Sequence, residues 1–571
     1  MPALRPYPFG ALVRRMLVEL DAEQAIFDLP VRRFVTGNPH LDLAVDFHGR
    51  RPASPLGPAA GPQTQMAQNI VLSWLGGCRI QELKTVQIDD ELEIPRPCID
   101  VHTVGLNAEW SQELKLEESL EEYVKGAMLV EILRQSGAVE VTPGFEPLAW
   151  DMSVGYDLAG IRSPRVQAFI ESMLDCRAVV ERLRRQIPEE CRALRDLDYP
   201  DRLSDTLTLS TFHGCPPDEI ERIIDFLMRQ NGLHCIVKFN PMLLGPEVTR
   251  ELLHDELGYD DLAVPESAFE RDTTWSQAVE IVGRLGDTAR ELGLSFGVKF
   301  SNTLIVENTR GFLAPAEKEV YLSGQPLHVL AMHLVRRFRR EFGDRFPISF
   351  AAGIDRLNYP DAAALGLAPI TVCTDLLRKG GYGRLAAYQA ELERRMGEVG
   401  ARSIDELSIS AYGRGLDALE SAGAGRGSPV WERCRDALAA GGDLLAAAGR
   451  ELFARWVSEA RLANTETYVE GLAADERYTR AANSTPPRKI GSHLELFDCI
   501  SCDICIPVCP NDANFAYRGP EQQIPVARAR RRGDGWEWRP GDPLKLARRH
   551  QIGTFLDVCN ECGNCDICIP V

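Results

Sequence analysis

The sequence predicts a mixed α/β protein built on an eight-stranded parallel (β/α)8 TIM barrel, with two smaller units after it. Short β-branched or apolar runs alternate with helical patterns through the first 400 residues, which is typical of parallel β/α units. Helical patterns fill the next stretch, and eight of the 16 cysteines lie between 499 and 568. We therefore expect a barrel over 1–395, a helical extension over 396–490 and a cysteine-rich domain over 491–571.

Eight barrel strands can be placed in order along the chain. A two-stranded opening is expected first, at 41–50 (LDLAVDFHGR). The strands that follow are 54–60, 79–86, 148–155, 206–211, 235–241, 295–301, 347–353 and 370–376. Between them, apolar residues recur at three- and four-residue spacing, as in DEIERIIDFLMRQNG and LHVLAMHLVRRFRREFG.

Eight such units are what a closed barrel requires, and its active site would lie at the C-terminal ends of the strands. An open doubly wound sheet is the structural alternative, but no G-x-G-x-x-G follows the first strand. Two long excursions, 242–273 and 303–326, follow the fifth and sixth strands. We expect them to lie over the barrel mouth as lids or substrate walls.

Composition excludes several classes of function. The net charge of -19 argues against a nucleic-acid partner, because phosphate binding needs clustered Lys and Arg. The basic run at 528–532 (RARRR) is expected to be a solvated hairpin edge. Arginines interrupt the apolar residues of the N-terminus, and no apolar run reaches the ~20 residues that span a bilayer. We expect a cytoplasmic protein without a membrane partner.

Two cysteine runs near the C-terminus carry the strongest chemical signal. The first reads C-x2-C-x2-C-x3-C-P and consists of Cys499, Cys502, Cys505 and Cys509, followed by Pro510. In this spacing three thiolates bind one iron–sulfur cluster and the fourth binds a second cluster. A zinc site is the alternative, but zinc knuckles usually pair two C-x2-C hooks. The second run consists of Cys559, Cys562, Cys565 and Cys568.

Two ligand assignments stay open for these cysteines. Either Cys509 joins the first three cysteines of the second run while Cys568 completes the first set, or the natural chain continues beyond Val571. Both assignments give two 4Fe-4S clusters. The sequence therefore predicts a small ferredoxin-like iron–sulfur domain that relays single electrons.

Glycine-rich turns follow the seventh and eighth strands, where barrels commonly hold a phosphate group. They read AAGID (351–355) and CTDLLRKGGYGR (373–384). A flavin phosphate would fit, because clusters deliver electrons singly and a flavin turns two of them into a hydride. Tight-turn glycine is the alternative explanation.

Several motifs resemble those of known flavoprotein barrels. SPLGPAAGPQTQ, ELKTV, LNAEW, LSTFHGCPPDEI, VKFNP, SNT, LSGQPL, AAGID and VCTDLL occur in the order of the dihydroorotate and dihydropyrimidine dehydrogenases. The chain most resembles the family of proposed selenate reductase subunits, which is linked to anaerobic purine breakdown. The resemblance implies FMN as the barrel cofactor. It also implies a separate FAD/NAD(P)H-dependent or other electron-donor subunit, because the module with that role is absent here.

The resemblance assigns roles to individual positions. The flavin would be held by Ala60, Gly61, Lys84, Thr85, Lys238, Gly324, Gly353, Cys373 and Thr374. A cation near the flavin stabilises the charge of its reduced ring, whereas a lone strand lysine is ordinarily half of a buried ion pair. Asn107, Asn302 and Thr303 match groups that bind the carbonyl and ring N–H edges of a planar heterocycle.

Cys215, in HGCPPDEI, matches the cysteine that exchanges a proton with the substrate carbon in these dehydrogenases. Most cysteines are instead small buried hydrophobes. His213 could tune its thiol. Thr208 stands where the family has a substrate-binding asparagine, which argues against the pyrimidine itself as substrate and for a larger or differently substituted ring.

Two classes of function follow from these residues. The first is an oxidoreductase subunit that reduces, or reversibly oxidises, a C=C or C=N bond of a purine- or pyrimidine-like heterocycle through FMN and two 4Fe-4S clusters. The second is a non-catalytic electron-transfer subunit of a larger reductase complex, with selenate reduction as one example.

Overall fold

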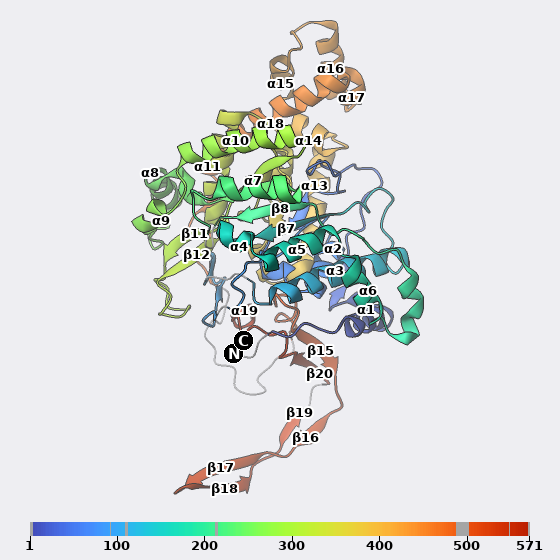
Figure 1. The fold of residues 1–571 in the computed structure, drawn as a ribbon, viewed down its shortest axis with the longest axis vertical. Coiled ribbons are helices and arrows are strands. Elements are labelled where there is room, and N and C mark those ends of the chain that lie inside the picture. The colour runs from blue at the N-terminus through green and yellow to red at the C-terminus, as the bar shows by residue number, and fades with distance from the viewer. Residues whose placement is uncertain are drawn as a thin grey trace.

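The computed structural model describes residues 4–91, 93–108, 112–211, 215–486, 502–546 and 549–568. Its largest feature is a sheet of eight parallel strands surrounded by helices (Figure 1). Within these ranges, no helix has both the length and the apolar character needed to cross a membrane. The predicted α/β barrel is confirmed.

All eight predicted barrel strands are present, in the order β3-β14-β13-β10-β9-β8-β7-β4. They are β3 (Leu56–Pro58), β4 (Ile80–Glu82), β7 (Ala149–Val154), β8 (Thr206–Ser210), β9 (His234–Phe239), β10 (Phe296–Phe300), β13 (Ile348–Phe350) and β14 (Ile370–Val372). The two end strands meet where the Arg79 N–H donates to the Leu56 carbonyl at 2.9 Å. This bond nearly closes the barrel.

A helix follows each barrel strand. In chain order these are α2 (Ala67–Leu75), α3 (Leu116–Gln135), α5 (Pro164–Leu174), α7 (Ile220–Asn231), α10 (Trp275–Leu292), α11 (Gln325–Phe342), α12 (Tyr359–Ala364) and α13 (Leu385–Val399). In α7 the buried residues recur at helical spacing from Ile220 to Met228, and left-handed Gly232 ends the helix. Thr274 and Gln277 form a capping box at the start of α10. Local sequence signals therefore set these helices.

The predicted two-stranded opening at 41–50 is wrong. The structure has only isolated bridges there, between Phe47 and Arg50 and between Asp42 and Ser403. A short two-stranded sheet forms earlier, from β1 (Ala25–Ile26) and β2 (Leu29–Pro30). The two residues between Phe47 and Arg50 both have positive φ, so the chain reverses at once. The Phe47 ring packs against the first residues of β4 and β7, which places this bridge at the N-terminal end of the barrel.

Loops at the barrel mouth form a small antiparallel sheet in the order β11-β12-β6-β5. Its strands are β5 (Ile99–Asp100), β6 (Gly105–Asn107), β11 (Leu304–Glu307) and β12 (Glu319–Ser323). The excursion 303–326 thus folds as a hairpin. The excursion 242–273 contains α8 (Pro246–Arg250) and α9 (Glu266–Glu270), and meets this hairpin where the Glu307 N–H donates to the Ala263 carbonyl at 2.9 Å.

Further helices follow α13. They are α14 (Ile404–Ser410), α15 (Gly415–Ser421), α16 (Pro429–Ala440), α17 (Leu444–Ala448) and α18 (Arg450–Leu472). Part of this segment has a core of its own around Trp431 and Trp456. Helix α18 is fastened to α11, because the Arg339 guanidinium donates to the Thr465 hydroxyl at 2.5 Å.

The C-terminal segment is mostly paired strands. β15 (Asn514–Arg518) pairs with β20 (His550–Thr554). Between them the chain forms an arm, in which β16 (Gln522–Ile524) pairs with β19 (Leu544–Leu546) and β17 (Ala527–Arg532) with β18 (Gly535–Pro540). Figure 1 shows the arm pointing away from the barrel. The basic run 528–532 lies on β17, as expected for a hairpin, and α19 (Asn564–Cys568) follows β20.

Candidate functional site

A cavity opens at the C-terminal ends of the barrel strands, beside the small antiparallel sheet. Every residue predicted to bind the flavin lines it: Ala60, Gly61, Lys84, Thr85, Lys238, Gly324, Gly353, Cys373 and Thr374. The predicted substrate residues Asn107, Asn302 and Thr303 line it as well. The fold therefore gathers in one place residues that are widely spaced in the sequence. Their individual roles stay predictions.

Thr208 does not line this cavity. It lies on β8, two residues before the cavity residue Ser210, and is 1% exposed. Its hydroxyl donates to the Asp151 carboxylate at 2.6 Å. Burial and the Glu82 charge raise the pKa of Asp151 to about 7. Thr208 thus belongs to the polar interior of the barrel, one layer below the cavity floor.

Cys215 is buried, and it does not line the cavity either. Burial raises the pKa of its thiol to about 12, and the Glu219 and Asp157 carboxylates add to this effect. A thiol in this environment keeps its proton at neutral pH, as a proton donor must. The predicted role of His213 falls outside the described residues.

Two lysines give the cavity wall its positive charge. Lys84 follows β4, and Lys238 lies on β9. Burial lowers the pKa of each amine to about 8, with the Lys238 charge adding to the effect at Lys84 and the Lys299 charge at Lys238. Both amines are mostly charged at neutral pH. An anion bound beside them would favour the charged form further.

A buried ion pair lies within the barrel near these lysines. The Lys299 ammonium donates to the Glu82 carboxylate and also to the Thr371 hydroxyl at 3.2 Å. Despite burial, the Lys299 and Lys238 charges hold the pKa of Glu82 below its usual value. Sequence reasoning missed this pair. Its signal was the phrase VKF, which occurs on both β9 and β10 and places Lys238 beside Lys299 in register.

One end of the cavity offers groups that bind phosphate. Helix α11 begins after Gly324 without a side-chain cap. Pro326 has no N–H, so the first backbone N–H groups that could face a ligand are those of Gln325 and Leu327. The Thr374 hydroxyl lies 2.8 Å from that of Ser323. Arg378 also lines this end, and its guanidinium donates to the Gln325 side chain at 3.1 Å. This cation was missed as a site residue, although the sequence marked its glycine-rich turn.

Gly353 is required by the backbone packing at this end. Its φ is +51°, and a Cβ there would lie 2.3 Å from the Gly324 carbonyl oxygen. Only glycine lets the two glycine-containing turns approach so closely. Any side chain at this position would push the two turns apart and fill this end of the cavity.

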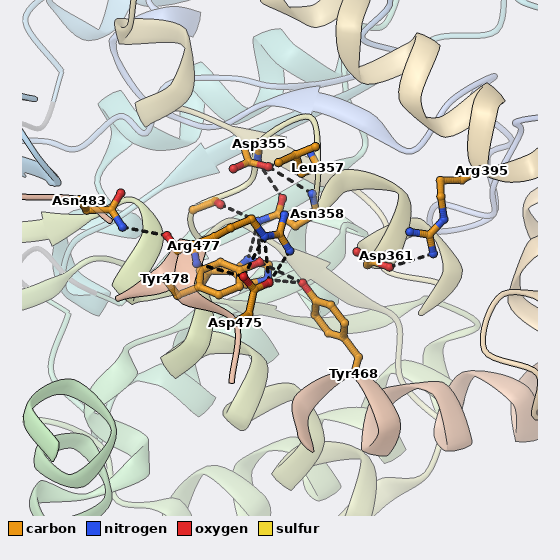
Figure 2. Close-up of polar contacts among 12 residues, drawn as sticks. Asp355, Leu357, Asn358, Asp361, Arg395, Tyr468, Asp475, Arg477, Tyr478 and Asn483 are labelled. Atoms are coloured by element: carbon orange, nitrogen blue, oxygen red, sulfur yellow. Dashed lines mark hydrogen bonds and ion pairs between the residues drawn. The ribbon is translucent and has the colours of Figure 1, made fainter. Parts of the chain in front are cut away.

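The segment after α18 supports this turn from outside. The Asn358 amide donates to the Gly353 carbonyl at 2.9 Å and to the Tyr478 hydroxyl at 3.3 Å. The Tyr478 ring stacks on His328 with centroids 5.0 Å apart. Figure 2 shows Asn358, Tyr468 and Tyr478 in one hydrogen-bonded group with Asp475 and Arg477. The helices beyond the barrel thus fix a turn that lines the cavity.

The cysteine-rich segment lies directly against the cavity wall. The Cys562 carbonyl accepts a hydrogen bond from the Ile99 N–H at 3.1 Å. The Asn564 amide donates to the carbonyls of Val508, at 2.7 Å, and Leu377, at 2.9 Å. Ile99 and Leu377 both line the cavity. The two cysteine runs therefore meet each other and the wall at one place.

The predicted cluster ligands are only partly described. Cys499 and the Cys568 side chain lie outside the described part of the chain. Burial is graded among the others: Cys502 is exposed, Cys505, Cys509, Cys559 and Cys565 are half-buried, and Cys562 is buried. Among the described side chains, no group of three or more His, Cys, Asp or Glu is arranged to hold a metal ion. Iron–sulfur ligation stays a prediction.

Residues 27–416 match the family model described as "Oxidoreductase YgfK, N-terminal TIM-barrel domain". Two relatives named "Putative oxidoreductase YgfK", from Escherichia coli K12 and O157:H7, are each 39% identical over 409 residues. The match covers 68% of this chain and 39% of each relative. The chain therefore spans about two fifths of the length of these relatives.

Among solved structures, the ligand-free DHODH of Eimeria tenella matches with a TM-score of 0.43 and 16% identity, over 70% of this chain and 97% of that one. The same enzyme in complex with ferulenol matches with a TM-score of 0.41 and 16% identity, over 71% of this chain and 96% of that one.

Replacing Glu82 by Gln should destabilise the protein by about 3–5 kcal/mol, because Lys299 then stays buried without its counter-charge. Urea unfolding of the two proteins measures this difference. The double variant Glu82→Gln, Lys299→Met should recover part of the loss, since neither charge remains. A single variant within about 0.5 kcal/mol of the parent would show that the pair does not contribute as described.

His328 should make stability depend on pH. Burial lowers its pKa from 6.5 to about 4, so the unfolded chain binds the extra proton first as pH falls. The stability from neutral His328 is complete above pH 6.5 and declines towards pH 4, by roughly 3 kcal/mol in all. Between pH 6.5 and pH 4, the free energy of unfolding should fall less steeply with pH in His328→Gln than in the parent. The exposed His40→Gln variant is the control, and an equal slope in parent and His328→Gln would contradict this account.

Proposed function

The chain belongs to the YgfK oxidoreductase family, and from this premise we propose that its barrel holds FMN and reduces, or reversibly oxidises, a C=C or C=N bond of a purine- or pyrimidine-like heterocycle. Electrons would pass through two 4Fe-4S clusters in the cysteine-rich segment. The single observation that carries the proposal is that every residue expected to bind the flavin lines one cavity, against which the Cys562 segment is hydrogen-bonded.

The chemistry of the cavity wall supports FMN. The phosphate would lie at the N-terminus of α11, among Gly324, Gly353, Thr374 and Arg378. A flavin supplies the conversion between single electrons and a hydride. Lys84 and Lys238 place positive charge where a reduced ring would carry negative charge.

The amides in the cavity suit an aromatic heterocycle with several polar edges. Asn302 is held in place by hydrogen bonds from its amide to the Lys238 carbonyl, at 3.1 Å, and to the Asn240 side chain, at 2.7 Å. The Asn107 amide donates to the Ala108 carbonyl at 2.7 Å. Among the described residues no group donates to either amide oxygen, so each could accept a ring N–H. A ligand without matching groups would leave these amides unpaired, which discriminates strongly between substrates.

Cys215 would supply the proton that accompanies the hydride. Its buried thiol stays protonated at neutral pH, so it can donate to a substrate carbon and recover a proton afterwards. The thiol does not line the cavity, so this role requires Cys215 to come closer to bound substrate than it lies here. Thr208 would act on the substrate only through the polar interior below Ser210.

The contact between the cysteine runs and the cavity wall supports an electron relay. The path from Cys562 to the cavity crosses one hydrogen bond, from the Ile99 N–H. Cys509 and Cys559 also pack against one group of buried apolar side chains. These side chains would keep water away from an iron–sulfur cluster bound between the two runs. Residues 491–571 would thus form the relay domain, 396–490 a support, and 1–395 the catalytic barrel.

The electron donor is proposed to be a separate FAD/NAD(P)H-dependent or other subunit, and the setting cytoplasmic. The matched relatives are more than twice as long as the part this chain spans, so they have room for further redox modules. A flavin with two clusters needs such a donor, because neither generates electrons itself.

Cys215→Ala should lower turnover by about 10²–10⁴-fold while flavin binding is unchanged, because only the proton donor is lost. The assay follows reoxidation of dithionite-reduced, FMN-loaded protein by urate, xanthine and uracil in turn. Cys176→Ala, another buried cysteine, is the matched control and should keep parent activity. Parent activity in Cys215→Ala would rule out the acid role, and weak FMN binding by the parent would rule out the flavin site.

Reconstitution with iron and sulfide should give about eight irons per chain, as two 4Fe-4S clusters require. Cys509→Ala and Cys565→Ala should each lower this to about four, whereas Cys434→Ala should not change it. Chemical iron analysis and the electron paramagnetic resonance spectrum of the reduced protein provide the measurement. About one metal ion per chain, with no electron paramagnetic resonance signal, would indicate a zinc site and would rule out the electron relay.

A further inference from the structure

The strand arm (522–546) takes no part in the proposed chemistry. Its strands pair only with one another in the described sheets, and the arm extends away from the body (Figure 1). Trp536 and Trp538 near its tip are 62% and 67% exposed. A two-stranded hairpin is marginally stable alone in water. An arm of this kind gains stability from a surface that covers it.

Strand register gives the arm two unlike faces. Residues directly opposite each other share a face, and successive side chains alternate between faces. Ala529 lies opposite Trp538, and Arg531 lies opposite Trp536, so both indole rings stand on one face, together with Arg531. This face is called the indole face below.

The other face of the arm is basic. By the same register it carries Arg528, Arg530, Arg532 and Arg539, with Glu537 among them. The Glu537 carboxylate accepts hydrogen bonds from Arg539 at 2.7 Å and lies 3.1 Å from the Arg532 guanidinium. Arg528 and Arg530 have no carboxylate partner among the described residues. The basic face thus keeps unneutralised positive charge.

The charge of the arm is opposite to that of the rest of the chain. Residues 527–540 contain five arginines and two carboxylates, a net charge of +3. The whole chain carries -19, so the remainder carries -22. The body of this protein is therefore an attractive surface for the arm of another copy. Its own body is out of reach, because the arm points away from it (Figure 1).

We propose that the arm docks on the acidic body of a second copy of this chain, so that two copies exchange arms across a twofold axis. A stable interface buries about 800 Å² on each partner, and a large aromatic side chain can bury about 150–250 Å². The two partly exposed indoles of one arm would bury roughly a third of the area that one partner contributes to such an interface. Because the exchange is reciprocal, the arm of the second copy would bury the same area again. The indole face packs on the other copy, where Arg531, on the same face, pairs with a carboxylate, and the arginines of the opposite face add longer-range attraction to the acidic body.

The test is the mass of the full chain in solution, measured by light scattering after gel filtration and by sedimentation velocity. The parent should have twice the monomer mass of 63.4 kDa. Trp536→Ser with Trp538→Ser should weaken association at least tenfold and shift the mass to 63.4 kDa. Val18→Ser, which changes a 63%-exposed apolar residue on the body, is the matched control and should remain dimeric.

A second variant guards against misfolding of the arm. Arg528→Glu with Arg530→Glu keeps both indoles, and should also give monomers because the acidic body then repels the arm. A monomeric parent at all concentrations would overturn the proposal, as would a dimer that survives both variants. Flotation of a monomeric parent with phosphatidylserine vesicles would overturn it too, by showing that a membrane surface is the partner of the arm.

Discussion

The closure of the eight-stranded sheet between β3 and β4 is the constraint on which the candidate site depends. Arg79 lies at this seam, and its backbone N–H donates to β3. Its buried guanidinium donates to the carbonyls of Phe145, at 2.7 Å, and Trp74, at 2.9 Å, so a charge inside the protein is satisfied by backbone oxygens. Once β4 is held beside β3, the turns after the two strands place Gly61 and Lys84 on one cavity.

The same closure encloses charged groups that an open sheet would leave in water. Lys238 and Lys299 lie side by side on neighbouring strands. The Glu82 carboxylate neutralises the charge of Lys299. The positive charge that remains is on the cavity wall. A fixed charge of this kind needs no reorganisation when negative charge develops beside it, so it would favour reduction of a ring bound as proposed.

Two elements outside the barrel hold the cavity from different sides. Tyr478 and Asn358 fix the turn that contains Gly353, and Asn564 ties the cysteine runs to Leu377. Gly381 allows the second contact, because its φ is +48° and a Cβ there would lie 1.7 Å from the Pro507 carbonyl oxygen. The chain after the barrel therefore both shapes the site and connects it to the proposed electron relay.

From the sequence alone, local periodicity predicted the eight strands and the helices between them, and short motifs marked many of the residues that line the cavity, although not Arg378. The sequence did not reveal the Glu82–Lys299 pair or the isolated bridge at Phe47, and it placed Thr208 and Cys215 with the substrate although neither lines the cavity. Those outcomes were decided by tertiary structure. Which face of a strand a charge occupies, and what stands opposite it, depends on register between segments far apart in the chain, and no local pattern specifies that register.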